Sequence, residues 1–267
     1  MTDWKITPGS TVSLSDLPTH TKEGAPGDKS VTEDALNDLV EKISSYQERL
    51  WAEQGQSLLV VLQAMDTAGK DGTIRAVFSG VNPQGVHVTS FKTPTSIELA
   101  HDFLWRIHQA TPAKGEIGVF NRSHYEDVLV VRVKNLVPES VWRSRYELIN
   151  HFEEQLVQSS TTVIKFFLHM SKEEQAKRLQ ARLDDPTKRW KFNSGDLVER
   201  ALWDDYQRAY QEAIEKTSTE MAPWYVIPAD RKWYRNWAVG KVIAETLEKM
   251  DPQYPEPEDV DPNLEIV

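Results

Sequence analysis

Apolar residues gather in five short runs along the chain. The stretch SLLVVLQAM (57–65) is continuously apolar and ends in a turn, which is typical of a strand buried on both faces. The other four runs lie at 85–91, 115–120, 161–170 and 223–230. Helical spacing of apolar residues predicts helices at 30–54, 72–81, 96–110, 141–159, 171–185 and 232–250. Strands that alternate with helices predict an α/β protein with a mostly parallel sheet and helices on both faces.

Two of the predicted helices carry start signals in their first residues. Thr32 is expected to cap the helix over 30–54, because a threonine side chain can accept a hydrogen bond from a free backbone N–H. Ser171 and Glu174 have the spacing of a capping box. Pro83 should end the helical region that starts at Gly72. The chain contains no internal repeat that would indicate a solenoid.

The two ends of the chain differ in composition from the middle. Residues 1–30 are rich in Thr, Ser, Pro and Gly without a sustained period, so we expect an extended arm laid over the main domain, 31–250. Residues 251–267 carry six acids and no base, and predict a mobile acidic tail. The net charge of −10 would argue against a polyanionic partner, but the tail contributes much of it. Since basic residues also cluster within 178–191, an anionic substrate stays possible.

Bulk composition limits the class of protein. A chain of 267 residues with 39% apolar and 27% charged residues suits one large α/β domain or two small ones. No apolar stretch reaches the roughly 18 residues that would indicate a membrane span, and the N-terminus lacks the layout of a secretory signal. The absence of cysteine excludes disulfides and thiolate metal sites. We therefore expect a cytoplasmic protein that does not bind membranes or nucleic acid.

The segment AMDTAGKD (64–71) is similar to a phosphate-binding loop, G-x-x-x-x-G-K-[ST]. Gly69 and Lys70 satisfy the pattern between a strand and a helix, whereas Ala64 and Asp71 depart from it. Backbone N–H groups and the lysine would hold phosphate. Asp66 makes sense beside phosphate if it holds Mg²⁺ or acts as a base. The alternative is an ordinary strand-to-helix turn with a surface lysine.

A second polar segment, NRSHYED (121–127), follows the predicted strand at 115–120. Because parallel strands end at the same edge of a sheet, Asn121 and Arg122 should point toward the phosphate loop. An arginine there can bind phosphate through two hydrogen bonds. Glu126 and Asp127 are candidate metal ligands or bases, and His124 is expected to have a structural role. The alternative is a polar turn with solvated charges.

A third segment, DDPTKRWKFNSGD (184–196), leaves a predicted helix through a proline and contains three cations. Such a basic hairpin between helices is typical of a mobile lid that closes over phosphates. The alternative is a solvated charge run. The nine tryptophans are expected to pack in the core and on the surface, and none is assigned to substrate stacking.

Five blocks, in this order along residues 30–250, resemble the polyphosphate kinase family 2. They are MDTAGKDGTIRAV, FNRSHYEDVLVVRV, RYELINHFEEQL, KRWKFNSGDL and APWYVIPADRKWYRN. The resemblance implies a P-loop kinase fold, a three-layer α/β sandwich with a helical lid around 184–196. It also implies phosphoryl transfer between inorganic polyphosphate and nucleotides with Mg²⁺, or Mn²⁺ in its place. The SHYED variant is similar to the subgroup that accepts both AMP and ADP.

The resemblance assigns roles to individual residues. Asp66, Lys70 and Arg122 match the positions expected to be catalytic, with Asp66 as metal ligand or base. Many members carry aspartate at the position of Asn121, so Asp127, or Glu126 in its place, is expected to complete the metal site instead. The predicted phosphate-binding and polyphosphate-binding set is Gly69, Lys70, Gly72, Thr73, Arg75, Arg122, Lys134, Arg178, Arg182, Lys188 and Arg189. The predicted nucleotide-binding set is Lys92, Asn121 and Glu126.

Two other functions compete with this interpretation. An ATP-dependent nucleoside monophosphate kinase would share the loop, lid and fold, but would be expected to keep Ser or Thr at position 71. A non-catalytic sensor of nucleotide or polyphosphate would bind these molecules without turnover and could use the acidic tail to bind a partner. The expected partners are inorganic polyphosphate, AMP, ADP and ATP, and we expect a homo-oligomer.

Overall fold

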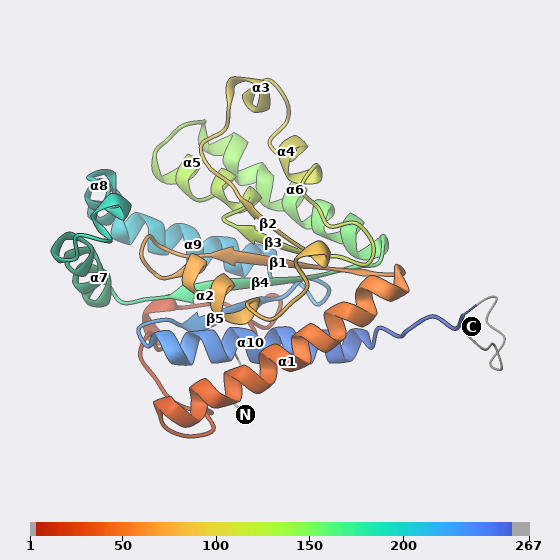
Figure 1. Ribbon diagram of the computed structural model, residues 1–267. Helices are drawn as coiled ribbons and strands as arrows, with labels where there is room; N and C mark the ends of the chain where they lie inside the picture. Colours follow the sequence, from red (N-terminus) through yellow and green to blue (C-terminus); the bar gives the residue numbers. More distant parts are fainter. Residues whose placement is uncertain (1–3, 258–267) are drawn as a thin grey trace.

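The computed structural model describes residues 4–257, which contain one five-stranded parallel sheet (Figure 1). All five strands lie where the sequence predicts them. They are β1 (Ser57–Gln63), β2 (Val86–Ser90), β3 (Ile117–Asn121), β4 (Thr161–His169) and β5 (Trp224–Pro228). Their order across the sheet is β2-β3-β1-β4-β5, and each neighbouring pair is parallel. The prediction of a parallel α/β sheet is therefore confirmed.

Helices cover both faces of the sheet and make it the middle of three layers (Figure 1). On one face lie α1 (Lys29–Glu53), α2 (Lys70–Val77) and α10 (Lys232–Met250). The other face is covered mainly by α6 (Glu139–Gln158) and α9 (Trp203–Thr217). The remaining helices are α3 (Ser96–Leu99), α4 (Trp105–His108), α5 (Val130–Val133), α7 (Lys172–Asp184) and α8 (Gly195–Ala201). Short 3₁₀ turns lie at Leu14–Asp16, Pro83–Gly85, His124–Asp127 and Arg189–Lys191.

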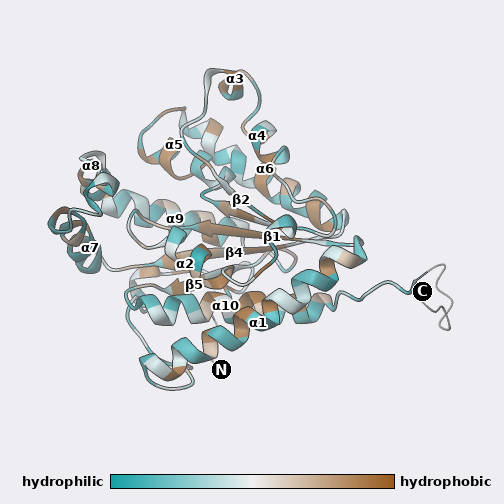
Figure 2. Cartoon of the chain, viewed as in Figure 1, coloured by the Kyte–Doolittle hydropathy of each residue, from teal (hydrophilic) through white to brown (hydrophobic). Residues whose placement is uncertain are grey.

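Strand β1 shows why a continuous apolar run forms the centre of this sandwich. Successive side chains of a strand point to opposite faces, so Leu58 and Val60 join the core beneath α1 and α10. Leu59 and Val61 join the core beneath α6 and α9. All seven residues of β1 are buried, and the strands appear as hydrophobic bands between more polar outer helix faces (Figure 2). No helix within residues 4–257 has the length and apolarity needed to cross a membrane.

Two predictions about where helices begin were wrong. Helix α1 begins at Lys29 and is capped by Asp28, whose carboxylate accepts a hydrogen bond from the Val31 N–H at 3.2 Å. Thr32 lies inside the first turn instead, and its hydroxyl donates to the Gly27 carbonyl. The helix predicted at 72–81 begins earlier, at Lys70. The spacing of apolar residues locates a helix but not its first residue.

The single helix predicted at 96–110 is divided into α3 and α4. Asp102 accepts a hydrogen bond from the Leu104 N–H at 3.0 Å, which favours a turn over a continued helix. The Ser171 cap is confirmed, because its hydroxyl accepts from the Glu174 N–H at 3.1 Å. The reciprocal half of the capping box is wrong, since the Ser171 N–H donates to Asp230 and the Glu174 carboxylate pairs with Arg178.

Before α1, the chain runs along the edge of strand β5. The Ile6 N–H donates to the Trp224 carbonyl at 2.8 Å, and the Val226 N–H donates to the Trp4 carbonyl at 2.9 Å. These bonds cover an edge that would otherwise expose unpaired backbone groups. Residues 251–257 form no helix or strand, and the rest of the tail predicted to be mobile, 258–267, lies outside the described residues.

Candidate active site

A cavity of about 820 Å³ lies beside the segments that follow strands β1 and β3. Ligands of parallel α/β sheets bind at this edge, where the carboxyl ends of the strands meet. Asp66 from the β1 loop and Arg122 from the β3 loop both line the cavity. Residues of α5, α8 and α9 complete its wall. Of the other predicted site residues, those that line the cavity are Lys92, Glu126, Asp127 and Lys134.

The loop between β1 and α2 has the backbone geometry of an anion site. Gly69 adopts φ +107°, a conformation that side chains disfavour. A Cβ atom at this position would lie 2.1 Å from Nη1 of Arg235, so a larger residue would require the Arg235 guanidinium to move. Gly69 is also the N-cap of α2, and no side chain caps the helix. The first N–H groups of α2 therefore have no side-chain acceptor, which is compatible with the predicted phosphate site.

Lys70 begins α2 and is only 9% exposed. Its ammonium donates to the Ala64 carbonyl at 3.0 Å, so it lies just behind the cavity wall. Burial, followed by the positive charge of Arg122, lowers the pKa of Lys70 to about 8, although nearby carboxylates oppose the shift. An anionic phosphate in the cavity would favour the charged form of this lysine.

Arg122 lies between two carboxylates. Its Nη2 donates to Asp66 Oδ1 at 2.7 Å, and its Nη1 lies 3.5 Å from Glu126 Oε2. The negative charge of Glu126, with a further contribution from Asp66, raises the pKa of Arg122 although burial opposes this. Arg122 has φ +63°, which is uncommon for a residue with a side chain and is concentrated at functional sites.

The ends of β1 and β3 meet as predicted. Besides the Arg122–Asp66 pair, the amide of Asn121 donates to Asp71 Oδ1 at 2.6 Å. Asp71 stands where a standard loop would have Ser or Thr, so the side chain of Asn121 connects the start of α2 to the end of β3. Asp71 and Asn121, the two residues that depart from the expected motifs, thus contact each other.

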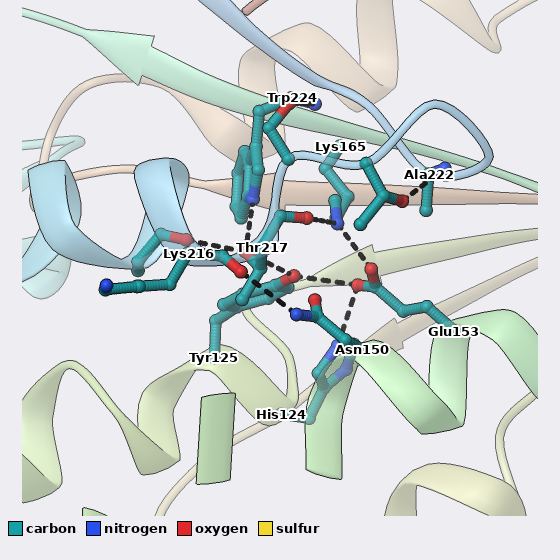
Figure 3. Close-up of polar contacts among 12 residues, drawn as sticks. His124, Tyr125, Asn150, Glu153, Lys165, Lys216, Thr217, Ala222 and Trp224 are labelled. Atoms are coloured by element: carbon teal, nitrogen blue, oxygen red, sulfur yellow. Dashed lines mark hydrogen bonds and ion pairs between the residues drawn. The ribbon is translucent and has the colours of Figure 1, made fainter. Parts of the chain in front are cut away.

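A buried polar network supports the turn that carries Arg122 and Glu126 (Figure 3). Glu153 on α6 pairs with Lys165 on β4, and its Oε1 accepts a hydrogen bond from the Tyr125 hydroxyl at 2.8 Å. His124 Nε2 lies 3.3 Å from the same oxygen, and burial lowers the pKa of this histidine. These groups are buried and belong to the turn at 124–127 or to the layer beneath it. His124 thus has the structural environment that the sequence indicates.

Several predicted phosphate-binding cations lie outside the cavity wall. Arg178 is buried behind the loop, where its guanidinium donates to the carbonyls of Thr67, Ala68, Ala229 and Asp230 and to the Glu174 carboxylate. Its donors are therefore occupied by the protein. Arg75 is exposed on α2 and does not line the cavity. Lys134 lines the cavity and pairs with Glu199 of α8.

The predicted lid segment, 184–196, has mostly local contacts. Lys188 lies 2.5 Å from Asp185, and the Arg189 Nε donates to the Leu183 carbonyl at 2.7 Å. Arg182 on α7 reaches Asp196 at 3.5 Å. Trp190 is 77% exposed. Only the end of the segment, including Asp196, lines the cavity.

Known proteins share both the sequence and this fold. The family model of Polyphosphate kinase 2 matches residues 27–255. The chain belongs to the polyphosphate kinase 2 family. It is 61% identical over 232 residues to an AMP/ADP-polyphosphate phosphotransferase of Meiothermus ruber, a match that covers 87% of each chain. It is 49% identical over 233 residues to an ADP-polyphosphate phosphotransferase of Rhodopseudomonas palustris, covering 83% of this chain and 81% of the relative.

A crystal structure of polyphosphate kinase 2 from Arthrobacter aurescens has the same fold. The TM-score is 0.93 at 45% sequence identity, and the match covers 96% of this chain and 92% of the other. The predicted P-loop kinase-like sandwich is therefore confirmed, and the family is one of phosphotransferases. The loop at 64–71 lies within the residues that the family model matches.

In this polyphosphate kinase 2 chain, Asp196 is the carboxylate that sequence reasoning missed. It lines the cavity, and burial followed by the negative charge of Asp66 raises its pKa. Asp127 pairs with Arg145 at 2.9 Å, and burial raises its pKa to about 6. Within residues 4–257 no three acidic or histidine side chains form a ready metal site. Since Mg²⁺ commonly uses one or two carboxylates plus water and substrate phosphates, Asp66 and Asp196 fit this ion.

Sequence reasoning also missed most of the aromatic and basic wall of the cavity. Arg106 and Arg145 line it, as do Tyr206 and Tyr210 of α9. The two tyrosines are four residues apart, which places them on one face of a helix. That spacing and the NSGD motif were the only sequence signals for this side of the site.

Proposed function

We propose that this protein transfers phosphoryl groups between inorganic polyphosphate and adenosine nucleotides, and accepts both AMP and ADP. The observation that carries the proposal is the meeting of Lys70, Arg122 and Asp66 beside the uncapped N-terminus of α2. Relatives that match most of the chain are named for reactions of this kind. The direction that dominates in the cell depends on the concentrations of the substrates, because one site serves both directions.

The reaction requires little proton chemistry from the protein. The attacking group is a phosphate oxygen of AMP or ADP, which is already anionic, so catalysis consists of positioning and charge neutralisation. The N–H groups of α2 and the ammonium of Lys70 would bind the transferring phosphoryl group. Arg122 would contact it from the opposite strand end while Asp66 and Glu126 hold the guanidinium in place.

The far wall of the cavity suits a nucleoside. Phe91, Pro94, Leu99 and Val137 supply apolar surface, and Lys92 lies among them. A base can rest on such a surface while cations bind its phosphates. We propose that the acceptor nucleotide lies here with its phosphates toward Arg122, and that Lys92, Asn121 and Glu126 help to orient it.

Mg²⁺, or Mn²⁺ in its place, would be held by Asp66 with Asp196 or Asp127 and would neutralise charge on the substrate phosphates. The lid segment at 184–196 would close over the phosphates and bring its cations toward them. Closure would exclude water, which would otherwise hydrolyse the phosphoryl group. Arg182, Lys188 and Arg189 are the cations that this movement would add to the site.

An ATP-dependent nucleoside monophosphate kinase remains the alternative to test. In this chain position 71 is Asp71, which accepts a hydrogen bond from Asn121 and offers no hydroxyl to a metal. The first experiment mixes purified protein with polyphosphate, Mg²⁺ and either AMP or ADP in the absence of ATP. ADP and then ATP should form from AMP, and ATP should form from ADP. Phosphorylation of AMP only when ATP is supplied would contradict the proposal, and binding without turnover would indicate a sensor.

We also propose that the protein acts in the cytoplasm as a homo-oligomer. The chain has no cysteine and is therefore compatible with a reducing compartment. Exposed apolar side chains such as Val31 and Leu148 occur on the outer helices α1 and α6. Light scattering coupled to gel filtration measures the mass in solution, and a mass equal to one chain would contradict the oligomer.

A further inference from the structure

Arg235 lies on the first turn of α10, directly behind the phosphate-binding loop. It is 2% exposed, and its Nη1 donates to the Ala68 carbonyl at 2.6 Å. Its Nε and Nη2 both donate to the side-chain oxygen of Asn236, at 3.2 and 2.8 Å. The same oxygen lies 3.4 Å from the Thr73 hydroxyl on α2. Arg235 therefore connects α10 to both the loop and the helix that follows it.

Within residues 4–257 no carboxylate forms an ion pair with Arg235. Burial lowers its pKa to about 9, and the second cause is the positive charge of Arg178. Arg178 also donates to the Ala68 carbonyl, at 3.0 Å. Two guanidinium groups thus share one backbone oxygen. A buried charge without a counter-ion is costly, so packing alone is a poor reason for an arginine at this place.

The two hydrogen bonds to the Ala68 carbonyl oxygen also fix the direction of the Gly69 N–H, because both groups belong to one planar peptide. In a trans peptide the carbonyl and the N–H of the next residue point in opposite directions. Because the Ala68 carbonyl points toward Arg235 and Arg178, the Gly69 N–H points away from them. The close approach of Arg235 to Gly69 is possible only because Gly69 lacks a Cβ atom. Rotation of this peptide would remove both hydrogen bonds and turn the N–H away from a bound phosphate.

We propose that Arg235 is a positioning residue of the phosphate-binding loop, which holds the Ala68–Gly69 peptide so that its N–H faces the phosphate. The proposal rests on the proposed function for the identity of the substrate, but not for the binding of phosphate. Arg178 also donates a hydrogen bond to the Ala68 carbonyl. Arg235 differs from it because it also lies against Gly69 and contacts helix α2 through Asn236. Loss of Arg235 should therefore disturb the loop without removing any group that touches the substrate.

The test compares Arg235→Ala and Arg235→Lys with Arg231→Ala. Arg231 belongs to the same segment but contacts His20 and not the loop, so it is a matched control. We expect kcat/KM for polyphosphate to fall about 10- to 100-fold in both Arg235 variants, since small displacements of a binding group have effects of this size. Lysine should not restore activity, because one ammonium cannot reach both Ala68 and Asn236 as the planar guanidinium does. Arg231→Ala should behave as the wild type.

Chemical rescue separates positioning from a general loss of stability. Guanidinium ion at millimolar concentration should restore part of the activity of Arg235→Ala, whereas ammonium should not. Each variant is assayed at a temperature at which circular dichroism finds it folded. Normal kinetics in a folded Arg235→Ala would overturn the proposal. If both Arg235 variants failed to fold and Asn236→Ala kept full activity, Arg235 would be a structural residue only, and the proposal would again be wrong.

Calorimetric binding of tripolyphosphate distinguishes this proposal from the proposed function. Binding needs no turnover, so it can be measured even if the wild type transfers no phosphoryl group. Weaker binding by Arg235→Ala than by Arg231→Ala supports the positioning role whatever the reaction is. Equal binding by the two variants contradicts it, even in an enzyme that uses polyphosphate as proposed.

Discussion

Lys70 and Arg122 are two cations held close together before any substrate is bound. Burial and then repulsion by Arg122 lower the pKa of Lys70, while Glu126 and Asp66 stabilise the charge of Arg122. A polyanion entering the cavity would relieve the repulsion. Without phosphate, the repulsion between Lys70 and Arg122 is not offset by a bound anion. Two cations held in this way can stabilise the negative charge of a transferring phosphoryl group.

Removal of either cation should affect the chemical step most. We expect Lys70→Ala and Arg122→Ala each to lower kcat at least ~100-fold, equivalent to about 2.7 kcal/mol of barrier. Steady-state rates with polyphosphate and ADP measure this. Lys249→Ala, which removes an exposed lysine at the far end of α10, is the control and should leave kcat unchanged. Near-normal turnover in either site variant would exclude that residue from the mechanism.

The pKa of Lys70 predicts the alkaline side of the pH profile. As pH rises through about 8, the free enzyme loses the positive charge of Lys70, so kcat/KM should fall above that pH. The fall in kcat should lie at higher pH, because bound phosphate favours the charged lysine. Substrate phosphates complete their own titration near pH ~6 and do not interfere.

The control for the pH profile is Lys70→Arg. Arginine stays charged throughout the range, so the remaining activity of this variant should show no decline near pH 8. The same decline in the variant and the wild type would assign the titration to another group. Each profile is measured as initial rates at low polyphosphate concentration, where the rate reports kcat/KM.

At the scale of elements, the strands were predictable, whereas only some of the helix ends were. A run such as 57–63 has a continuous apolar centre because the strand is buried on both faces, and this pattern can be recognised in the sequence. The start of α1 depended on whether Asp28 or Thr32 caps the helix, and both residue types are good caps; Asp28 does so by accepting the Val31 N–H. The break between α3 and α4 likewise depended on one side-chain hydrogen bond, from Leu104 to Asp102.

The candidate site was predictable to the extent that its residues lie in contiguous motifs. Asp66, Lys70 and Arg122 directly follow strand ends, and the topology of a parallel sheet brings such positions together. Arg178 and Arg235 show the limit of this reasoning. One was expected to bind phosphate and the other was not considered, yet both lie behind the loop on the Ala68 carbonyl. Charge and spacing do not reveal whether an arginine faces a cavity or a backbone oxygen.

The Glu153–Lys165 pair should contribute to the stability of the layer beneath the second motif. Lys165→Met should destabilise the protein by about 3–5 kcal/mol, because it leaves the buried Glu153 carboxylate without its cation. Glu33→Gln breaks the exposed pair between Lys29 and Glu33 and should cost less than about 0.5 kcal/mol. Urea unfolding followed by circular dichroism measures both. A cost for Lys165→Met as small as that of Glu33→Gln would mean that the network adds nothing to stability.

At the scale of the whole molecule, the α/β sandwich is tightly packed and the lid segment is not. The sheet and its helices bury two apolar cores, one on each face. By contrast, 184–196 has mostly local ion pairs, and its largest apolar side chain, Trp190, is exposed. A segment with few buried contacts can move at little cost while the scaffold keeps the catalytic residues in place. A rigid sandwich combined with a weakly held segment at 184–196 is the arrangement that closure over a long, charged substrate requires.

Limited proteolysis can test whether the segment at 184–196 closes over the site. Trypsin should cut the free protein first after Lys188, Arg189 or Lys191, because exposed segments with local contacts are the preferred sites of cleavage. Polyphosphate together with AMP should slow these cuts, since the closed lid would bury them against the substrate. Cleavage after Lys22, which is exposed in the N-terminal arm, serves as the control and should keep its rate. Equal protection at both places would indicate general stabilisation by ligand, and no protection at 188–191 would mean that the segment does not close over the site.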